Sequence, residues 1–404
     1  MPSERAADMT AITIVGGVYH ERCIWPDWNN LYGSGGRAVA ALSGHIDQIR
    51  LRAYARTDTS LAFAPYAATY GFKFDPVEVA QTVSFEYVHS LSNPVIRPTY
   101  ARIRQNPPIN VSDTLVLRFG LLEGSAIVTA DRCVYDPQSA FDPEAFGANG
   151  SKASHLAIVA NRNEVLAMSQ SSDPIDGARA LLRAGAEVVV IKSGPEGAYV
   201  VDDNDVAHVS AYRSKGVWTI GSGDVFAAIF AARWGAHGDS PLMAADLASK
   251  AVAAYVESMA LPAPTLEMLR SDQRAEAITV PGRVYLASPF FTLGQRWLVD
   301  EAREGLKQLG LEVFSPVHDV GRGPAETVAP ADLAALNECD RVFAILDGID
   351  SGTVFEVGYA RARDVPVYVL AQAVPPEDLK MVTGSDCRVF DDFVTALHHT
   401  AWRT

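Results

Sequence analysis

The sequence predicts an α/β protein of two domains, each with a mostly parallel sheet covered by helices on both faces. Short apolar runs alternate with helical stretches from residue 11 onward, a pattern typical of parallel strands joined by helices. The chain has 404 residues. A chain of this length usually folds around two or more hydrophobic cores, because a single core seldom grows this large. The same rhythm restarts after a segment rich in proline and charge near residue 270, so the chain is expected to divide there.

The first domain is predicted to span residues 1–270, with a linker at 271–281. Its expected strands are short and apolar, at residues 11–17, 114–118, 126–130, 156–160 and 187–191. Helices are expected at 176–184 and from Gly223 onward through 243–259. Residues 50–110 carry a weaker pattern, which fits a small β lid or an edge insertion.

The second domain is predicted to span residues 282–404. We expect its strands at 283–287, 312–315, 341–346 and 367–370, and its helices at 295–309, 331–337 and 353–363. This makes a compact unit of ordinary domain size. His398 and His399 fall after the last expected element, so we expect both in an exposed C-terminal tail.

Composition limits the partners of the chain. Its net charge is −14, which argues against a nucleic-acid polymer, because phosphate binding needs a basic face. The four cysteines are far apart and form no CxxC pair, which argues against a zinc site or a disulfide framework. No signal-type segment and no apolar run of roughly 18 residues is present. These observations predict a cytoplasmic protein that acts on small molecules away from membranes.

A glycine-rich turn at Gly221, Ser222 and Gly223 leads into a predicted helix, with Asp224 in its first turn. Small residues allow a phosphate to approach the backbone, and the helix N-terminus offers N–H groups and the positive end of the dipole. Asp224 would then accept a proton from an attacking hydroxyl. A tight turn capped by an aspartate explains the same four residues equally well.

Further motifs in matching order accompany this turn over residues 10–265. They are Gly16-Gly17, Gly33-Ser34-Gly35-Gly36, Asp136-Pro137, Asn161-Arg162-Asn163-Glu164 and Lys192-Ser193-Gly194-Pro195-Glu196-Gly197. Together with the glycine-rich turn, they resemble the PfkB family of carbohydrate and nucleoside kinases, which implies a ribokinase-like three-layer fold.

The resemblance implies ATP and Mg²⁺ as cofactors and assigns a role to each matching residue. Gly35 and Gly36 would contact the substrate, and Asp224 would be the base. The nucleotide would be held by a set of residues spread over three motifs: Gly221, Ser222, Gly223, Asn161, Glu164, Lys192 and Gly194. Glu164 would act on the metal indirectly, through water.

Three positions depart from that family. Trp218 stands where an aspartate precedes the glycine-rich turn, Glu21 replaces the substrate-binding aspartate, and Arg37-Ala38-Val39-Ala40 lacks the usual asparagine. These departures allow two hypotheses about the function of this domain. The domain phosphorylates an unusual acceptor, or it binds a nucleoside as a sensor or scaffold without phosphorylating it.

An acidic loop in the second domain runs directly into a helix, with Asp350 in the loop and Glu356 six residues later. Ligands of open α/β sheets bind at the carboxyl ends of the strands, where this loop is expected. A carboxylate there suits attack on an anomeric carbon. A purely structural role is an alternative, because an acidic side chain near a helix N-terminus interacts favourably with the helix dipole. This role would explain Asp350, but it explains Glu356 less well, since Glu356 lies deeper in an apolar helix.

This loop, together with the run Val284–Phe291 and the pair Asp332-Leu333, resembles the nucleoside 2-deoxyribosyltransferase family over residues 282–385. A flavodoxin-like parallel sheet follows from the resemblance, with no cofactor in this domain. Glu356 would be the nucleophile, Asp332 would protonate the leaving base and Tyr285 would orient Glu356. The substrate would be bound by Ser288, Pro289 and Phe290 on the base side and by Asp350, Ser351, Gly352 and Thr353 on the sugar side.

The combined expectation is a bifunctional enzyme of nucleoside or sugar metabolism. Its partners would be a nucleoside, a nucleobase or a pentose. The alternatives are that only the C-terminal domain catalyses, or that both folds form a ligand-binding regulator. A homo-oligomer is also expected, because in the transferase family a neighbouring C-terminal segment completes the pocket, and Lys380-Met381-Val382 is the matching segment here.

Overall fold

The computed structural model describes residues 9–139 and 142–402. Its described residues divide into two compact units, one with the residues up to Ser214 and Trp218–Glu276, the other with Lys215–Val217 and the residues from Ala277 onward. Lys215–Val217 is tied to the second unit by the backbone N–H of Val217, which donates to the Thr395 hydroxyl over 2.9 Å. The linker predicted at 271–281 stays a prediction.

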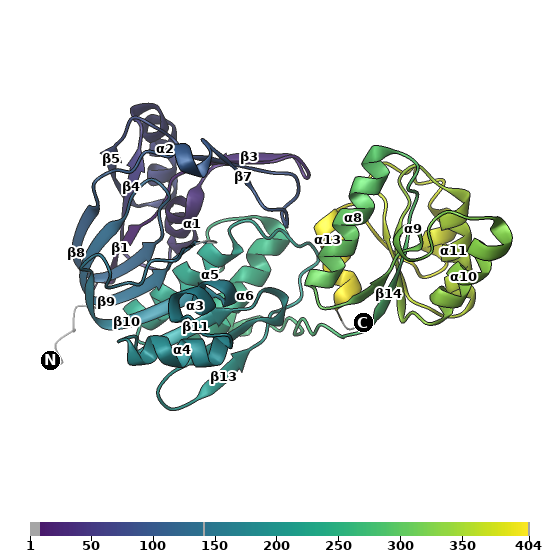
Figure 1. Ribbon diagram of the computed structural model, residues 1–404. Coiled ribbons are helices and arrows are strands. Elements are labelled where there is room, and N and C mark those ends of the chain that lie inside the picture. Colours follow the sequence, from purple (N-terminus) through teal and green to yellow (C-terminus); the bar gives the residue numbers. More distant parts are fainter. Residues whose placement is uncertain (1–8, 140–141, 403–404) are drawn as a thin grey trace. The chain divides into compact units, whose positions relative to one another are not determined.

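A nine-stranded sheet forms the centre of the first unit (Figure 1). Its order is β13-β12-β11-β10-β9-β8-β1-β4-β5, with only the β11–β12 and β12–β13 pairs antiparallel. The strands are β1 (Ala11–Val15), β4 (Gln48–Ala55), β5 (Lys73–Glu78), β8 (Ile109–Phe119), β9 (Ala126–Asp136), β10 (Lys152–Asn161), β11 (Val188–Lys192), β12 (Ala198–Val201) and β13 (Val206–Val209). The direction of the chain through the sheet reverses between β1 and β8, so the topological switch point lies there.

Helices cover both faces of this sheet, which makes three layers. One apolar cluster includes α1 (Gly33–Leu42), α5 (Ser222–Phe230) and α6 (Pro241–Ser258), and the other includes α3 (Arg162–Ser169) and α4 (Pro174–Arg183). The remaining helical segments are α2 (Thr57–Tyr70), α7 (Leu266–Ser271), the short turns Tyr100–Arg102 and Gly194–Glu196, and a π-helical stretch Ala231–Ala236.

The long helix expected after Gly223 is interrupted. Gly238 has a φ of 70°, a left-handed conformation that ends a helix. Ser240 then accepts a hydrogen bond from the Met243 N–H, and Pro241 occupies the first turn of α6. Such a cap begins a new helix.

A separate four-stranded sheet lies beside the carboxyl ends of β1 and β8. It consists of β2 (His20–Cys23), β3 (Trp28–Leu31), β6 (Ser84–Tyr87) and β7 (Val95–Arg97), in the order β3-β2-β6-β7. We call it the β lid. Two of its strands lie within residues 50–110, where the sequence pattern was weak, and the other two lie before α1.

The second unit has a five-stranded, all-parallel sheet in the order β15-β14-β16-β17-β18. Counted along the chain this is 2-1-3-4-5, the flavodoxin-like order, so the predicted fold class is confirmed. The strands are β14 (Arg283–Ala287), β15 (Glu312–Phe314), β16 (Arg341–Ile345), β17 (Val367–Leu370) and β18 (Arg388–Phe390). The helices are α8 (Leu293–Gln308), α9 (Pro316–Asp319), α10 (Ala325–Asn337), α11 (Ser351–Ala362), α12 (Lys380–Gly384) and α13 (Phe393–Ala401).

The exposed tail expected at the C-terminus is wrong for His398. This residue lies in α13 and is buried, with Nδ1 hydrogen-bonded to the Val394 carbonyl over 2.9 Å. Burial lowers its pKa to about 4. The apolar face of α13 packs against β16 and β17. This tertiary contact buries His398, which was expected to be exposed because it falls after the last predicted element. No helix in the described ranges has the length and apolar character needed to span a membrane.

Candidate functional site

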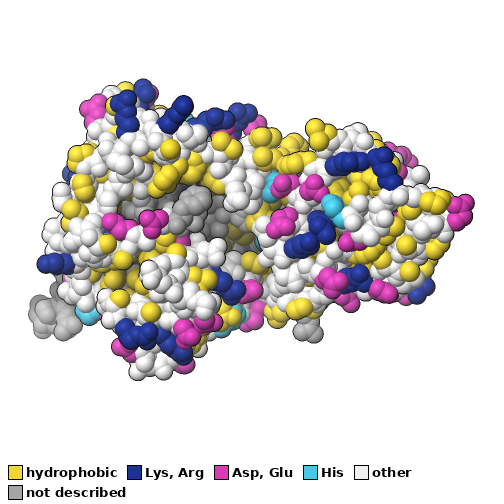
Figure 2. All heavy atoms as spheres, in the orientation of Figure 1, with side chains coloured by type: hydrophobic (Ala, Val, Ile, Leu, Met, Phe, Trp, Pro, Cys, Tyr) yellow, Lys and Arg dark blue, Asp and Glu magenta, His cyan; other side chains and the backbone are white. Residues whose placement is uncertain are grey.

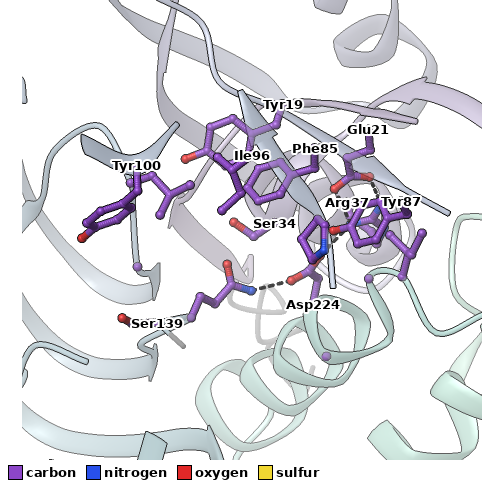
Figure 3. A pocket seen from close by; sticks show the side chains of 17 residues that line it. Tyr19, Glu21, Ser34, Arg37, Phe85, Tyr87, Ile96, Tyr100, Ser139 and Asp224 are labelled. Carbon is purple, nitrogen blue, oxygen red and sulfur yellow. Dashed lines mark hydrogen bonds and ion pairs between the residues drawn. The ribbon is translucent and has the colours of Figure 1, made fainter. Parts of the chain in front are cut away.

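The first unit contains a cavity of about 310 Å³ at the carboxyl ends of β1, β8 and β9 (Figure 3). Its walls come from the β lid, the start of α1 and the start of α5. This is the switch point of the sheet, where open α/β sheets bind their ligands. Gly221, Gly223 and Asp224 of the glycine-rich turn line it, so the motif that the sequence singled out faces this cavity.

Gly221 precedes α5 with a φ of 79°, a left-handed conformation that favours glycine. A Cβ at this position would lie 2.1 Å from Nε of Arg37. The guanidinium of Arg37 therefore packs directly over the turn, in the space beside the N-terminus of α5.

Arg37 joins the two acidic residues of the cavity. Its Nη1 donates to Asp224 Oδ2 over 2.6 Å and to Glu21 Oε1 over 3.3 Å, and its Nη2 forms an ion pair with Glu21 Oε2. Its Nε donates to the Tyr255 hydroxyl over 3.0 Å. Burial lowers the pKa of Arg37, but Glu21, Tyr255 and Asp224 raise it by more, so it lies well above its usual value. The guanidinium is 1% exposed and stays charged, which makes it a permanent partner of Asp224.

The second oxygen of Asp224 is also engaged. Gln138 Nε2 donates to Asp224 Oδ1 over 2.5 Å, as the dashed line in Figure 3 shows. Gln138 itself has a φ of 46°, an uncommon conformation for this residue type. Both carboxylate oxygens of the expected base therefore accept hydrogen bonds from other side chains.

Three predicted nucleotide-binding residues, Lys192, Ser222 and Gly223, lie around the same helix start. Lys192 forms an ion pair with the buried carboxylate of Asp136, and its Nζ would lie 3.5 Å from a Cβ at Gly223. Ser222 is the first residue of α5, so Gly223 and Ser222 stand at the helix N-terminus.

The other residues predicted to bind the nucleotide or the substrate are Asn161, Glu164, Gly194, Gly35 and Gly36. Most of them make local contacts within the protein. Asn161 and Glu164 form a reciprocal capping box at the start of α3. Gly194 is exposed in a short turn with a φ of 56°. The N–H groups of Gly35 and Gly36 donate to the Gly17 carbonyl, and it is their neighbour Ser34 that lines the cavity.

The acidic side chains among and beside these residues have partners within the protein. Asp136 is paired with Lys192, Glu164 caps its own helix, and Asp224 is held by Arg37 and Gln138. Among residues 9–139 and 142–402, no group of three or more His, Cys, Asp or Glu side chains is arranged to hold a metal ion. Both oxygens of Asp224 are thus committed to protein partners, whereas Asp136 Oδ1 is buried without a hydrogen-bond partner among the described residues.

The second unit brings Tyr285 and Glu356 together. Tyr285 lies on β14 and Glu356 on α11, which follows β16. Because β14 and β16 are neighbours at the switch point of this sheet, the pair lies where flavodoxin-like folds bind ligands. The Tyr285 hydroxyl donates to Glu356 Oε1 over 2.7 Å.

The pKa of Glu356 is raised to about 7. Burial is the largest cause, and the charges of Asp332 and Asp350 add to it, while the hydrogen bond from Tyr285 opposes it. A carboxylate with this pKa is partly ionised at neutral pH and is weakly held by an uncharged donor. That is the environment of a group that reacts or exchanges protons.

Asp332 lies on α10, and its Oδ1 is buried with no hydrogen-bond partner in the protein. Burial raises its pKa above the usual value. A buried polar atom without a partner is costly, so its presence beside Glu356 points to a ligand that supplies the missing hydrogen bond.

Asp350 caps α11. Its Oδ2 accepts from the Thr353 N–H over 2.9 Å and from the Thr353 hydroxyl over 3.1 Å, so the helix-capping role considered from the sequence is present. Thr353 is buried, while Ser351 and Gly352, the first two residues of α11, are exposed. The helix start therefore has two residues open to solvent and two that fix its geometry.

The predicted base-side residues follow β14. Ser288 and Pro289 are buried and Phe290 is half-buried. The ring of Phe290 stacks on Phe291 with centroids 5.2 Å apart. Ser288, Pro289 and Phe290 directly follow β14, the strand that carries Tyr285. One chain segment therefore contains both Tyr285 and the predicted base contacts.

Sequence reasoning missed several residues of the first cavity, namely Gln138, Tyr19, Phe85 and Tyr87. Gln138 follows the Asp136-Pro137 pair, which was the only local signal for it. Phe85 and Tyr87 lie on β6 and Tyr19 directly precedes β2, and no local pattern reveals that these two segments lie together. The contact of Arg37 with Asp224 joins residues 187 positions apart, so it is visible only in the folded chain.

Comparison with known proteins identifies two families. Residues 131–266 match the family model described as pfkB family carbohydrate kinase. Residues 284–389 match the model described as Nucleoside 2-deoxyribosyltransferase. The chain joins a kinase-family segment to a transferase-family segment. Both resemblances expected from the motifs are thereby confirmed, and a search of curated proteins found no match.

Solved structures similar to this chain are ribokinase-family proteins. A ribokinase from Thermotoga maritima is 17% identical, with a TM-score of 0.48, and covers 65% of this chain and 99% of its own. A putative ribokinase II from E. coli is 14% identical, with a TM-score of 0.49, and covers 65% and 98%. A fructokinase from Vibrio cholerae O395, solved with fructose, ADP and calcium, is 14% identical, with a TM-score of 0.47 and the same coverage as the E. coli protein.

Proposed function

We propose that the C-terminal, transferase-family domain cleaves or exchanges the N-glycosidic bond of a nucleoside through a covalent glycosyl–Glu356 intermediate. The observation that carries this proposal is the hydrogen bond between Tyr285 and a Glu356 whose pKa is raised to about 7. A nucleophile held by a neutral hydroxyl keeps one oxygen available for attack.

Two steps follow from this arrangement. In the first, a Glu356 oxygen attacks C1′ of the sugar, the bond from C1′ to the base nitrogen breaks, and the base takes a proton from Asp332 as it leaves. In the second, water or another base attacks C1′ from the opposite face and Glu356 is released as a carboxylate. The attacking group gives its proton back to Asp332, so the domain returns to its starting state.

The raised pKa of Asp332 supports its part as the acid, because burial keeps its proton bound at higher pH than usual. Asp350 supports a preference for an unphosphorylated 5′-hydroxyl. A capping carboxylate at the sugar end of the cleft would repel a 5′-phosphate at contact distance. Faster cleavage of a nucleoside 5′-monophosphate than of its nucleoside would contradict that preference.

The direct test is product analysis of a nucleoside panel with wild-type protein and Glu356→Gln. We expect a free base and a free sugar, or an exchanged base when a second base is added. Acid-quenched wild type should carry the mass of one glycosyl group, and Glu356→Gln should not. A glycosyl adduct on another residue, or release of base by Glu356→Gln at the wild-type rate, would contradict the proposal.

For the N-terminal domain, the geometry favours the binding alternative over phosphorylation. The supporting observation is that Arg37 and Gln138 occupy both oxygens of Asp224, the residue expected as base. We propose that this domain binds a ligand in its cavity without transferring phosphate. Incubation with Mg²⁺, ATP and a panel of nucleosides and pentoses should consume no ATP above background. Acceptor-dependent formation of ADP would contradict this.

We propose that the protein forms a homo-oligomer, because the C-terminal unit exposes several large hydrophobic side chains. Leu293, Phe291 and Phe355 are 86%, 65% and 61% exposed, and Met381, in the segment predicted to reach a neighbour, is 82% exposed. Figure 2 shows hydrophobic side chains among charged ones on the visible face of this unit. Such exposure on a soluble surface often marks an interface. Light scattering should give a mass above that of one chain, and Leu293→Asp should lower it.

A further inference from the structure

The second unit contains a short segment from the N-terminal part of the chain. Lys215–Val217 belongs to the second unit, whereas Ser214 before it and Trp218 after it belong to the first. The chain therefore enters the second unit, leaves it again, and returns for good at Ala277. A simple linker passes between domains once, in an exposed stretch that few contacts hold. We call Lys215–Val217 the crossing segment.

Helix α13 of the second unit holds the crossing segment with two hydrogen bonds. The Val217 N–H donates to Thr395 Oγ1 over 2.9 Å, and both residues are buried. His399 Nε2 lies 3.1 Å from the Lys215 carbonyl, which can only accept, so this nitrogen is the donor. A buried N–H that loses its acceptor is costly, so the bond to Thr395 fixes where Val217 lies.

The same helix also holds the chain where it returns to the second unit. The Val280 N–H donates to the Ala401 carbonyl over 3.1 Å. The guanidinium of Arg341 joins the two backbones, because its Nη1 donates to the Thr400 carbonyl over 2.8 Å and its Nη2 to the Val280 carbonyl over 3.3 Å. Both passages of the chain into the second unit are therefore fixed on α13.

The crossing segment leads directly into the glycine-rich turn of the first unit, which begins at Gly221. The intervening residues are bonded to α6: the Trp218 N–H donates to the Val256 carbonyl over 2.8 Å, and the Ile220 carbonyl accepts from the Tyr255 hydroxyl over 2.9 Å. Each residue has only two soft backbone dihedrals. A chain held before the turn and along the approach to it therefore has little freedom left to place the turn elsewhere.

We infer that α13 positions the glycine-rich turn. Thr395 and His399 fix the crossing segment, and the crossing segment fixes the residues Gly221–Asp224, three of which line the N-terminal cavity. The influence runs along the chain itself, so these two are positioning residues without a part in either proposed reaction. The order of a turn that faces a ligand in the first unit thus depends on a helix of the second. This inference goes beyond the proposed functions and needs neither of them.

The test is hydrogen–deuterium exchange of the full chain, read by mass spectrometry on peptides that cover residues 217–225. The N–H groups of Ser222 and Val225 donate to the Thr219 and Gly221 carbonyls, so their exchange reports the order of the turn. Thr395→Val keeps the shape of the side chain and removes the acceptor. It should speed exchange across the turn about tenfold, since the loss of a buried hydrogen bond changes an opening equilibrium by about that factor. Thr395→Ser, which keeps the hydroxyl, should exchange as the wild type does.

Thr400→Val is the matched control. Thr400 is also buried on α13, but its hydroxyl donates to the Ala396 carbonyl within the helix over 2.8 Å. This variant disturbs the same helix and should leave exchange at the turn unchanged. His399→Phe keeps an aromatic ring and removes the second hydrogen bond, so it should speed exchange at the turn by less than Thr395→Val. If Thr395→Val does not fold, the comparison of His399→Phe with Thr400→Val decides instead.

Two results would overturn the inference. Faster exchange confined to Val217 would mean that α13 holds the crossing segment without ordering the turn. Equal acceleration at the turn by Thr400→Val would mean that the turn responds to general loosening of the second unit. Neither result touches the proposed functions, and absence of base release, or formation of ADP in the ATP assay, would leave the exchange pattern as expected here.

Discussion

Each unit places one carboxylate on a helix at the switch point of its sheet, yet the two carboxylates have opposite kinds of partner. Asp224 is held by the charged guanidinium of Arg37 and by the Gln138 amide. Glu356 is held by the neutral hydroxyl of Tyr285, and burial, with smaller contributions from Asp332 and Asp350, raises its pKa to about 7. The same kind of position therefore contains a carboxylate paired with a permanent positive charge in one unit and a carboxylate with a raised pKa in the other.

The difference shows that a retained catalytic motif does not by itself determine chemistry. A permanently charged partner, as Arg37 is for Asp224, holds a carboxylate in a buried ion pair and occupies the oxygen that a substrate hydroxyl would meet. Burial without a positive partner does the reverse and leaves the group responsive near neutral pH. The partner, which comes from a distant part of the chain, decides between these outcomes.

The largest expected effect separates the two carboxylates directly. Glu356→Gln should reduce release of base from a nucleoside by roughly 10⁴-fold or more, because it removes the attacking atom. Asp224→Asn should leave that rate within about twofold, since its cavity takes no part in the glycosidic step. Steady-state rates of both variants measure this. Equal losses in the two variants would mean that the units share one reaction.

The next effect is on stability. Arg37→Met leaves Glu21 and Asp224 buried without their partner, which should destabilise the first unit by about 3–5 kcal/mol. The neutral combination Arg37→Met, Glu21→Gln and Asp224→Asn should recover most of that loss. Differential scanning calorimetry should show the change in one transition only. If Arg37→Met alone melted at the wild-type temperature, Arg37 would not be the partner that stabilises Glu21 and Asp224.

A smaller effect is expected at Asp332. Asp332→Asn should slow cleavage of a natural nucleoside by about 10²-fold, because the departing base loses its proton donor. A riboside of p-nitrophenol, whose leaving group departs as an anion, is the matched substrate and should be cleaved by this variant at nearly the wild-type rate. Equal loss on both substrates would instead assign Asp332 to binding or folding.

The smallest effect is a shift along the pH axis. Glu356 must be ionised to attack, so kcat/KM should rise with pH through about 7. The Tyr285 hydrogen bond lowers the pKa of Glu356, so Tyr285→Phe should move the rising limb to higher pH. At pH 7 the variant should be up to about tenfold slower and should approach the wild-type rate above pH 8. A rising limb that moves to lower pH would contradict the assigned direction.

Local sequence accounted for much of the architecture. The residues 283–287 predicted as a strand are β14, and the apolar run at 341–346 contains β16, because a buried parallel strand needs a continuous apolar stretch. The β lid was less visible, since its strands are short and half-exposed, and its central pair, β2 with β6, joins residues that are distant in the sequence, such as His20 and Ser84. The burial of His398 was mispredicted for a related reason, because only packing of α13 on the sheet makes that position internal.

Local patterns in the amino-acid sequence were enough to predict two α/β folds, their order, Asp224 at the start of one helix and Glu356 within another, because strand periodicity and glycine turns act over a few neighbouring residues. Which side chain faces each carboxylate became visible only in the folded chain. Arg37 reaches Asp224 from a separate helix, and Tyr285 reaches Glu356 from a neighbouring strand. The charge state of a buried acid depends on the groups within a few ångströms of it, and chain folding, not chain order, selects those groups.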